Sequence, residues 1–364
     1  MAVVDTQVAV VGGGIVGLAC AAALASGGLP TIVLERHKKP GTETTSRNSQ
    51  VIHGGLYYEP GSLKAELCVR GAAQLYAYCE RRGVEHKRVG KLVVADAGEV
   101  PLLEALAERA TRNGALVSLV GAARVAELEP NVRASAALES PATGIVDTHG
   151  FVDAVAADLA SSGGLLACGR EVVGAERDGA AWLLRCEGAA GEEQVRAPVV
   201  INAAGLVADA VAALFGIDVD ARGYRQRWVK GNYFRIKGAP LVSRLVYPMP
   251  PKDGEGLGIH ATVELDGSVR LGPDTEPVAA IEYSVDEGRR AAFHRAASRY
   301  LPSLRPEQLE PDMAGIRPKL ARGSDFVIER DAASGVWNLV GIESPGLTAA
   351  LAIAERVARA ILEG

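Results

Sequence analysis

Residues 7–35 read QVAVVGGGIVGLACAAALASGGLPTIVLE, and this stretch decides the fold of the chain. Gln7–Val11 is a short run rich in β-branched residues, as expected of a buried parallel strand. Three glycines follow at once, and the alanine-rich segment Leu18–Ser26 predicts a helix. Thr31–Leu34 predicts the next strand. The stretch therefore predicts a βαβ unit, the opening element of a Rossmann-like domain.

The glycines of this unit have the spacing of a dinucleotide-binding fingerprint. Gly12 permits the tight turn after the strand, Gly14 lets the backbone approach a pyrophosphate, and Gly17 lets the helix pack closely on the strand. The N–H groups and the dipole of the helix then face the phosphates. Glu35 follows the second strand, where its carboxylate accepts hydrogen bonds from ribose hydroxyls and its charge disfavours a 2′-phosphate. FAD and NAD both fit this fingerprint, so the rest of the chain must distinguish them.

Size and composition indicate a globular protein of two domains. The chain has 364 residues, of which 48% are hydrophobic and 23% charged, and this length exceeds what one core usually organises. The formal net charge of −5 gives no electrostatic basis for binding nucleic acid. The five cysteines form no CxxC pair, which argues against a disulfide framework or a metal site. This cysteine usage favours a reducing compartment, and we expect the cytoplasm.

The uncharged stretch from Thr6 to Leu34 also raises the alternatives of a signal peptide and a membrane span. The only charge before it is Asp5, whereas signal peptides begin with basic residues. Glycines at the nucleotide-binding spacing interrupt the run, and cleavage within it would destroy the site. We therefore expect no transmembrane segment, while a peripheral contact with a membrane stays compatible with the sequence.

The pattern after Glu35 departs from that of a nicotinamide dehydrogenase, in which strands and helices continue to alternate. A polar segment, Gly41–Ser49, leads into Val51–Tyr58. Later in the chain, short β-patterns predict a meander whose last strand ends in Ala203-Ala-Gly205: Glu171–Glu176, Trp182–Cys186, Gln194–Arg196 and Val199–Ile201.

The carboxyl end predicts a further strand–turn–helix element. Val336–Val340 is the strand, and Gly341–Gly346 turns into a helix with Ser344 as the expected N-cap and Pro345 as its first residue. The amino terminus of this helix is suited to stabilise negative charge on a reduced flavin, although the pattern fits a well-capped terminal helix without that role equally. One face of this predicted helix is an apolar stripe, formed by Leu347, Leu351, Ala354, Val357, Ala358 and Ile361.

Taken together, these elements resemble the D-amino-acid-oxidase-like superfamily of FAD oxidoreductases over essentially the whole chain. More narrowly, residues 46–71, SRNSQVIHGGLYYEPGSLKAELCVRG, closely resemble the L-2-hydroxyglutarate dehydrogenase family. Asn232 stands where that family typically has Asp. Four shorter segments support the resemblance: Lys230-Gly-Asn-Tyr-Phe234, Tyr247-Pro-Met-Pro250, Gly256-Leu-Gly-Ile-His260 and Ala314-Gly-Ile-Arg317.

The resemblance implies the architecture. We expect a discontinuous, Rossmann-like FAD-binding domain from residues 1–83, 142–214 and 316–364. A substrate domain built on an antiparallel sheet takes residues 84–141 and 215–315. Besides Gly12, Gly14, Gly17 and Glu35, the residues expected to contact FAD are Ile15, Val16, Arg36, Ser46, Arg47, Asn48, Ser49, Val51, His53, Val173, Ala204, Gly205, Gly341, Gly346, Leu347 and Thr348.

Oxidation of a secondary alcohol beside a carboxylate needs a flavin, a base and a carboxylate clamp. Histidine is the natural base near neutral pH, and we expect His53 or His260 in this role. His260 follows a predicted Gly-Leu-Gly-Ile strand and opens a hairpin that turns at Asp266-Gly267. The resemblance places a carboxylate-binding arginine at Arg317, whose planar guanidinium can bind a carboxylate through two parallel hydrogen bonds.

Other side chains are candidates for the lining of the substrate pocket. Lys319 adds a charge for a second carboxylate, although it fits a solvated surface equally well. The aromatic candidates, whose hydroxyl groups are donors, are Tyr57, Tyr58, Tyr233 and Tyr247.

The implied function is the FAD-dependent oxidation of a small, L-2-hydroxyglutarate-like 2-hydroxy acid to the 2-keto acid. An amino-acid or secondary-amine oxidase of the same superfamily is the enzymatic alternative. A flavin-binding protein with a sensory or structural role is the alternative from another class. Molecular oxygen, a quinone and a carrier protein stay open as electron acceptors.

Overall fold

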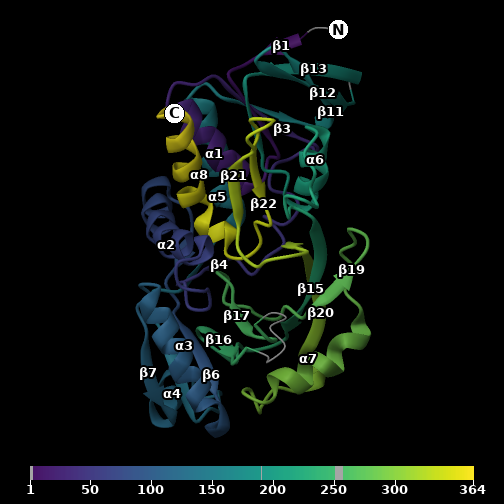
Figure 1. Cartoon of the computed structure of the whole chain (residues 1–364). Coiled ribbons are helices and arrows are strands. Elements are labelled where there is room, and N and C mark those ends of the chain that lie inside the picture. The colour runs from purple at the N-terminus through teal and green to yellow at the C-terminus, as the bar shows by residue number, and fades with distance from the viewer. Residues whose placement is uncertain (1–2, 190, 251–256) are drawn as a thin grey trace.

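The computed structural model describes residues 3–189, 191–250 and 257–364, which form two lobes (Figure 1). The upper lobe in Figure 1 contains both ends of the chain, whereas the lower lobe contains segments from its middle. Each lobe is built on one large sheet. Among the described residues, no helix combines the length and the apolar character that a bilayer crossing requires.

The sheet of the upper lobe has six strands in the described part of the chain, in the order β10-β3-β2-β14-β22-β21. Neighbours from β10 to β22 pair in parallel, and β21 pairs antiparallel with β22. The predicted βαβ unit is confirmed as β2, α1 (Ile15–Ser26) and β3. The strands are β2 (Val8–Val11), β3 (Thr31–Glu35), β10 (Leu165–Cys168), β14 (Val199–Asn202), β21 (Val327–Arg330) and β22 (Trp337–Val340).

Different elements cover the two faces of this sheet, because successive side chains of a strand point to opposite sides. Val8 and Val10 belong to a core with helices α1, α2 (Leu63–Arg82), α5 (Thr148–Ser161) and α8 (Gly346–Leu362). Ala9 and Val11 belong to a second core, which contains residues of the predicted meander and of a short helix. These elements are β11 (Glu171–Asp178), β12 (Ala181–Gly188), β13 (Gly191–Ala197), which also pairs with β1 (Val3–Asp5), and α6 (Ala208–Leu214).

The lower lobe is built on a nine-stranded sheet of described residues, in the order β19-β15-β18-β17-β16-β6-β8-β7, with β20 also paired to β15. Its pairs are antiparallel except for β6 with β16. The strands are β6 (Lys91–Ala95), β7 (Ser118–Gly121), β8 (Ala136–Ser140), β15 (Gln226–Ile236), β16 (Leu245–Pro248), β17 (Ala261–Val263), β18 (Val269–Leu271), β19 (Glu276–Val278) and β20 (Leu309–Leu320).

Helices and a small sheet complete the lower lobe and its junction with the upper one. β4 lies where the two lobes meet (Figure 1) and pairs with β9, which also pairs with β5. The bounds of these elements are α3 (Val100–Arg112), α4 (Ala122–Leu128), α7 (Arg290–Ala297), β4 (Val51–Ile52), β5 (His86–Lys87) and β9 (Gly144–Val146).

Two sequence predictions are wrong, one at the start of α8 and one just before His260. Ser344 does not cap α8, whose N-cap is Pro345, because the Ser344 hydroxyl is hydrogen-bonded to His53 instead. The residues just before His260 form no strand, since strand structure begins at Ala261, and Gly256 lies outside the described residues. The predicted hairpin turn after His260 is present between β17 and β18.

Two further sequence predictions differ from the structure in their bounds. The sequence predicts a surface helix from Arg289 to Tyr300, whereas the α-helix found there, α7, ends at Ala297. The predicted domain boundary between residues 315 and 316 falls inside β20, which pairs with β15 on both sides of that point.

Gly71 of α2 is a position at which packing leaves no room for a side chain. A Cβ atom there would lie 2.4 Å from the carbonyl oxygen of Thr348 in α8. We predict that Gly71→Ala lowers the free energy of unfolding by about 1–3 kcal/mol, since α2 and α8 must move apart. Denaturant unfolding measures this, with Gly98→Ala as control because no atom lies within 4 Å of a Cβ at Gly98. Equal stability of both variants would contradict the close packing of α2 on α8.

Candidate active site

Two adjoining cavities, of about 480 Å³ and 110 Å³, extend from the carboxyl ends of β2 and β14 toward the nine-stranded sheet of the lower lobe. In open α/β sheets this edge is where ligands bind. The larger cavity continues between the lobes to residues of β15, β16 and β20. The two cavities share five lining residues: Gly14, Thr44, Thr45, Ala203 and Gly205. They therefore form one elongated space suited to an extended dinucleotide.

The smaller cavity surrounds Glu35, whose carboxylate is already oriented by the backbone. One oxygen accepts from the N–H of Gly13 and the other from the N–H of His37, both at 2.7 Å. Arg36 lines the same cavity and forms an ion pair with Glu43. The cavity is also lined by Gly12, Ala204 and Val172, whereas Val173, the residue named from the sequence, is not among the lining residues.

The amino terminus of α1 opens onto both cavities. Gly14 is the N-cap and has no side chain to cap the first turn, while the N–H of Ile15 donates to Thr45 Oγ1 at 3.2 Å. Gly17 lies in the packing behind the turn, where a Cβ would be 2.1 Å from the Gly12 carbonyl oxygen. Gly14 thus leaves the first turn of α1 open to phosphates, and the close contact between Gly17 and Gly12 holds this turn in place.

Most other residues expected to contact FAD line the larger cavity. The exceptions are Ser46, Gly341 and Thr348. Thr348 is fully buried, and its hydroxyl bonds to the Val51 carbonyl and the His53 N–H. It therefore fixes the backbone of the lining segment. The lining residues from this set are Gly14, Ile15, Val16, Arg47, Asn48, Ser49, Val51, His53, Gly205, Gly346 and Leu347.

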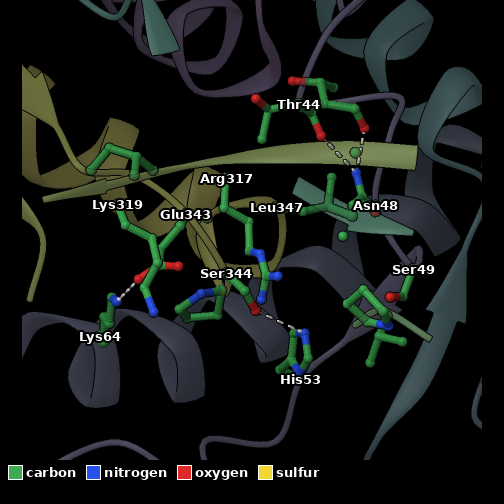
Figure 2. A pocket seen from close by; sticks show the side chains of 18 of the residues that line it. Thr44, Asn48, Ser49, His53, Lys64, Arg317, Lys319, Glu343, Ser344 and Leu347 are labelled. Atoms are coloured by element: carbon green, nitrogen blue, oxygen red, sulfur yellow. Dashed lines mark hydrogen bonds and ion pairs between the residues drawn. The ribbon is translucent and has the colours of Figure 1, made fainter. Parts of the chain in front are cut away.

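All of the residues predicted to act on the substrate line the larger cavity. These side chains come from five separate parts of the chain, and Figure 2 shows several of them around the cavity. They are His53, Tyr57, Tyr58, Tyr233, Tyr247, His260, Arg317 and Lys319.

His260 has a defined tautomer and an unpaired nitrogen. Its Nδ1 lies 3.0 Å from the Gly258 carbonyl oxygen, which only accepts, so Nδ1 carries the proton and Nε2 carries the lone pair. Nε2 is buried without a hydrogen-bond partner in the described part of the chain. The ring stacks on Tyr247 with 3.6 Å between centroids. Burial, followed by the charge of Lys91, lowers the pKa of His260 to about 3, so the imidazole is neutral at physiological pH.

His53 lies close to the carboxyl-terminal turn. Its Nε2 is 3.2 Å from the Ser344 hydroxyl, as the dashed line in Figure 2 shows. Burial lowers the pKa of His53 well below the usual histidine value, and the charge of Lys91 lowers it further. His53 is therefore also neutral, with one ring nitrogen engaged by Ser344.

Arg317 points from β20 into the cavity (Figure 2). Its Nη2 donates to the Asp274 carbonyl oxygen at 2.9 Å, and its Nε is buried without a partner among the described residues. The Asp274 carboxylate is in turn held by the side chains of Asn232 and Arg289. Nη2 of Arg317 is thus held by Asp274, and Nε is left to donate to a ligand.

Sequence reasoning missed two lysines at this site. Lys64 lines the larger cavity and pairs with Glu343 at 2.9 Å (Figure 2). Lys91 is 1% exposed on β6, with Nζ 3.9 Å from the centroid of the Tyr247 ring. The sequence feature that could have indicated Lys91 is a lysine at the start of the otherwise apolar strand Lys91–Ala95.

The FAD dependent oxidoreductase family (DAO) matches residues 7–360. The chain belongs to this family. Its cofactor is FAD, and the elongated space, the open first turn of α1 and the oriented Glu35 fit that dinucleotide.

Several relatives that resemble the chain in sequence are L-2-hydroxyglutarate dehydrogenases. The mitochondrial protein of Arabidopsis thaliana is 36% identical over 99% of this chain and 83% of that protein. The human mitochondrial protein is 34% identical over 97% of this chain and 88% of that protein. A bacterial relative from Indibacter alkaliphilus is 34% identical over 74% of this chain and 68% of that protein.

Solved structures of this family share the fold. The L-α-glycerophosphate oxidase of Mycoplasma pneumoniae, a structure with FAD bound, has a TM-score of 0.90 at 24% identity. That alignment covers 99% of this chain and 95% of the other. Glycine oxidase from Geobacillus kaustophilus has a TM-score of 0.83 at 21% identity, over 99% and 95% of the two chains. The predicted fold class is confirmed.

Glu35 provides a direct test of the FAD site. We predict that Glu35→Gln weakens FAD binding about tenfold, because an amide NH₂ group then faces an N–H donor and the turn loses its orientation. Flavin released per polypeptide, and titration of the apoprotein with FAD, measure the change. Glu192→Gln removes an exposed carboxylate of β13 and serves as control. FAD affinity equal to wild type in Glu35→Gln would rule out the role given to this carboxylate.

Proposed function

We propose that this FAD-dependent enzyme oxidises a small 2-hydroxy acid, of the L-2-hydroxyglutarate type, to the 2-keto acid. One observation carries the proposal. Two side chains that line the same cavity, Arg317 and His260, each have a buried nitrogen without a partner among the described residues. Nε of Arg317 is a donor and Nε2 of His260 is an acceptor. A 2-hydroxy acid supplies the matching groups, a carboxylate and a hydroxyl on neighbouring carbon atoms.

The reaction assigns one task to each side chain. Arg317 binds the carboxylate and orients the substrate. His260 takes the hydroxyl proton at Nε2, because Nδ1 already carries the proton that is donated to Gly258. As the O–H bond breaks, the adjacent carbon loses a hydride and the carbonyl group forms. Bound FAD supplies the acceptor for that hydride.

His53 is the competing proton acceptor, and the geometry favours His260. The Nε2 of His53 is engaged by the Ser344 hydroxyl, whereas the Nε2 of His260 has no described partner. We assign His53 a contact on the flavin side of the cavity, since Thr348 holds its backbone next to the start of α8.

Lys319 supports a substrate with two carboxylates. It lies two residues beyond Arg317 on β20 and lines the same cavity. Side chains at i and i+2 of a strand share one face, about 7 Å apart. Lys319 is therefore suited to the second carboxylate of a short dicarboxylic acid, which agrees with the names of the related dehydrogenases.

We also propose that the protein works in a reducing compartment such as the cytoplasm. Its five cysteines are free, and four of them are buried. The related plant and human proteins are named mitochondrial, so fractionation of cells that contain this protein is the test.

The substrate class is tested by anaerobic mixing of the oxidised holoenzyme with a panel of acids. We predict that L-2-hydroxyglutarate, or another L-2-hydroxy dicarboxylate, bleaches the flavin absorbance and yields the keto acid without ammonia. The D-enantiomer and glycerol 3-phosphate are the controls. Bleaching by amino acids alone, with release of ammonia, would move the enzyme to the amine-oxidising branch. FAD that no hydroxy or amino acid reduces would favour a non-enzymatic flavoprotein.

The roles of Arg317 and His260 are separated by kinetics. We predict that Arg317→Met raises KM about 100-fold, since a charge-assisted hydrogen bond to the substrate carboxylate is lost. His260→Asn lowers the rate of flavin reduction by about 10²–10⁴, with a smaller effect on KM. His53→Asn is the matched comparison and should reduce that rate less. A larger loss in His53→Asn than in His260→Asn would transfer the base role to His53.

A further inference from the structure

Lys91 is a buried cation to which the reaction above gives no task. It is 1% exposed at the start of β6, between Ser140 of β8 and Leu245 of β16. It forms no ion pair with a carboxylate in the part of the chain that the structure describes. A buried charge without a counter-ion is costly, and an apolar residue of similar size normally gives a more stable core. Packing alone therefore does not explain a lysine here.

The surroundings of Lys91 place its charge directly behind the substrate cavity. Its Nζ lies over the Tyr247 ring at 3.9 Å and is 5.5 Å from the Tyr57 centroid. The imidazole of His260 stacks on Tyr247 at 3.6 Å with an interplanar angle of 13°. Two groups this close to one ring must occupy opposite faces. Lys91, Tyr247 and His260 thus form a stack that ends at the cavity.

We propose that Lys91 is a positioning residue whose ammonium group, buried behind Tyr247, takes its counter-charge from the carboxylates of the bound substrate. The face of the Tyr247 ring stabilises the ammonium group. The ring also keeps water out of the gap between the cation and the cavity, so the attraction between Lys91 and a bound carboxylate is screened less than in water. This inference rests on the proposed function, in which the ligand is an anionic 2-hydroxy acid. It makes Lys91 a determinant of specificity for acids, in addition to Arg317 and Lys319.

The titratable groups around Lys91 are consistent with this role. Tyr57, Tyr247, His53, His260 and Cys68 lie around it on four segments of the chain, and none of them is an anion at neutral pH. Burial raises the pKa of the Cys68 thiol to about 12, and His53 and His260 are held neutral. Burial also lowers the pKa of Lys91 itself to about 7. The ammonium charge is therefore present below that pH and is lost as the pH rises through it, unless an anion binds.

The experiment measures the affinity of the oxidised holoenzyme for glutarate, a non-reacting dicarboxylate, by the change in flavin absorbance. Between about pH 6 and pH 9, wild type should bind glutarate progressively more weakly. Lys91→Met should bind about tenfold more weakly at the acid end, as expected for one charge at an intermediate dielectric constant, and should lose the pH dependence. Lys91→Arg should bind tightly across the range, because its charge persists.

Lys230→Met is the matched control. Lys230 is also buried, but it is paired with Glu282 and does not line the cavity, so the variant should keep the wild-type pH dependence. Glutarate binding with the same affinity and pH dependence in Lys91→Met and wild type would overturn the inference. Failure of wild type to bind any dicarboxylate would instead overturn the proposed function.

Thermal stability gives a second readout that needs no ligand. The pKa of Lys91 is lower in the folded state than in the unfolded one, so its charge opposes folding fully below about pH 7 and less as the pH rises. Lys91→Met holoenzyme should therefore unfold near pH 6 at the same temperature as wild type or a higher one. A clearly lower unfolding temperature would show that the ammonium group stabilises the fold, and would contradict the proposal.

Discussion

The contact between β20 and the segment that follows β3 determines the rest of the site. The Thr44 hydroxyl donates to the Ile316 carbonyl, and a Cβ at Gly315 would lie 2.0 Å from the Arg47 carbonyl oxygen. A residue other than glycine would push β20 away from the FAD lobe. Because Arg317 is two residues farther along the same strand, this contact fixes the distance between Arg317, the proposed carboxylate clamp, and the cavity beside the glycine fingerprint. The nine-stranded sheet and the FAD-binding lobe are thus held next to each other, although their residues alternate along the chain.

Electrostatics give this shared space its selectivity. Arg317 and Lys319 line the cavity and Lys91 lies behind Tyr247, while the acid of the Lys64–Glu343 pair is already neutralised. The two histidines are neutral because burial opposes their protonation, and the charge of Lys91 opposes it further at both rings. A ligand that enters the cavity therefore meets positive charge and uncharged bases. A bound carboxylate offsets this positive charge and so makes it easier for Nε2 of His260 to accept the hydroxyl proton.

Local sequence patterns predicted the FAD lobe well, because its signals are short-range. The glycine spacing from Gly12 to Gly17 and the strand that ends at Glu35 follow from turn and helix geometry alone. The carboxyl-terminal turn was predicted less well, since the Ser344 hydroxyl is bonded to His53, 291 positions away in sequence, in place of capping α8. Arg317 and the two candidate histidines came from a family resemblance. Lys91 was missed because only the tertiary structure brings β6 behind the Tyr247–His260 stack, and no spacing in the sequence encodes that contact.

A crystal structure of the oxidised holoenzyme with a bound, non-reacting 2-hydroxy acid analogue would show whether Arg317 and His260 hold the substrate as proposed. We expect the ligand carboxylate on the guanidinium of Arg317 and its hydroxyl group within hydrogen-bonding distance, about 2.6–3.2 Å, of Nε2 of His260. The reacting carbon should then face the flavin. A carboxylate bound elsewhere in the cavity, with Nε2 of His260 turned away from the ligand hydroxyl, would contradict the account.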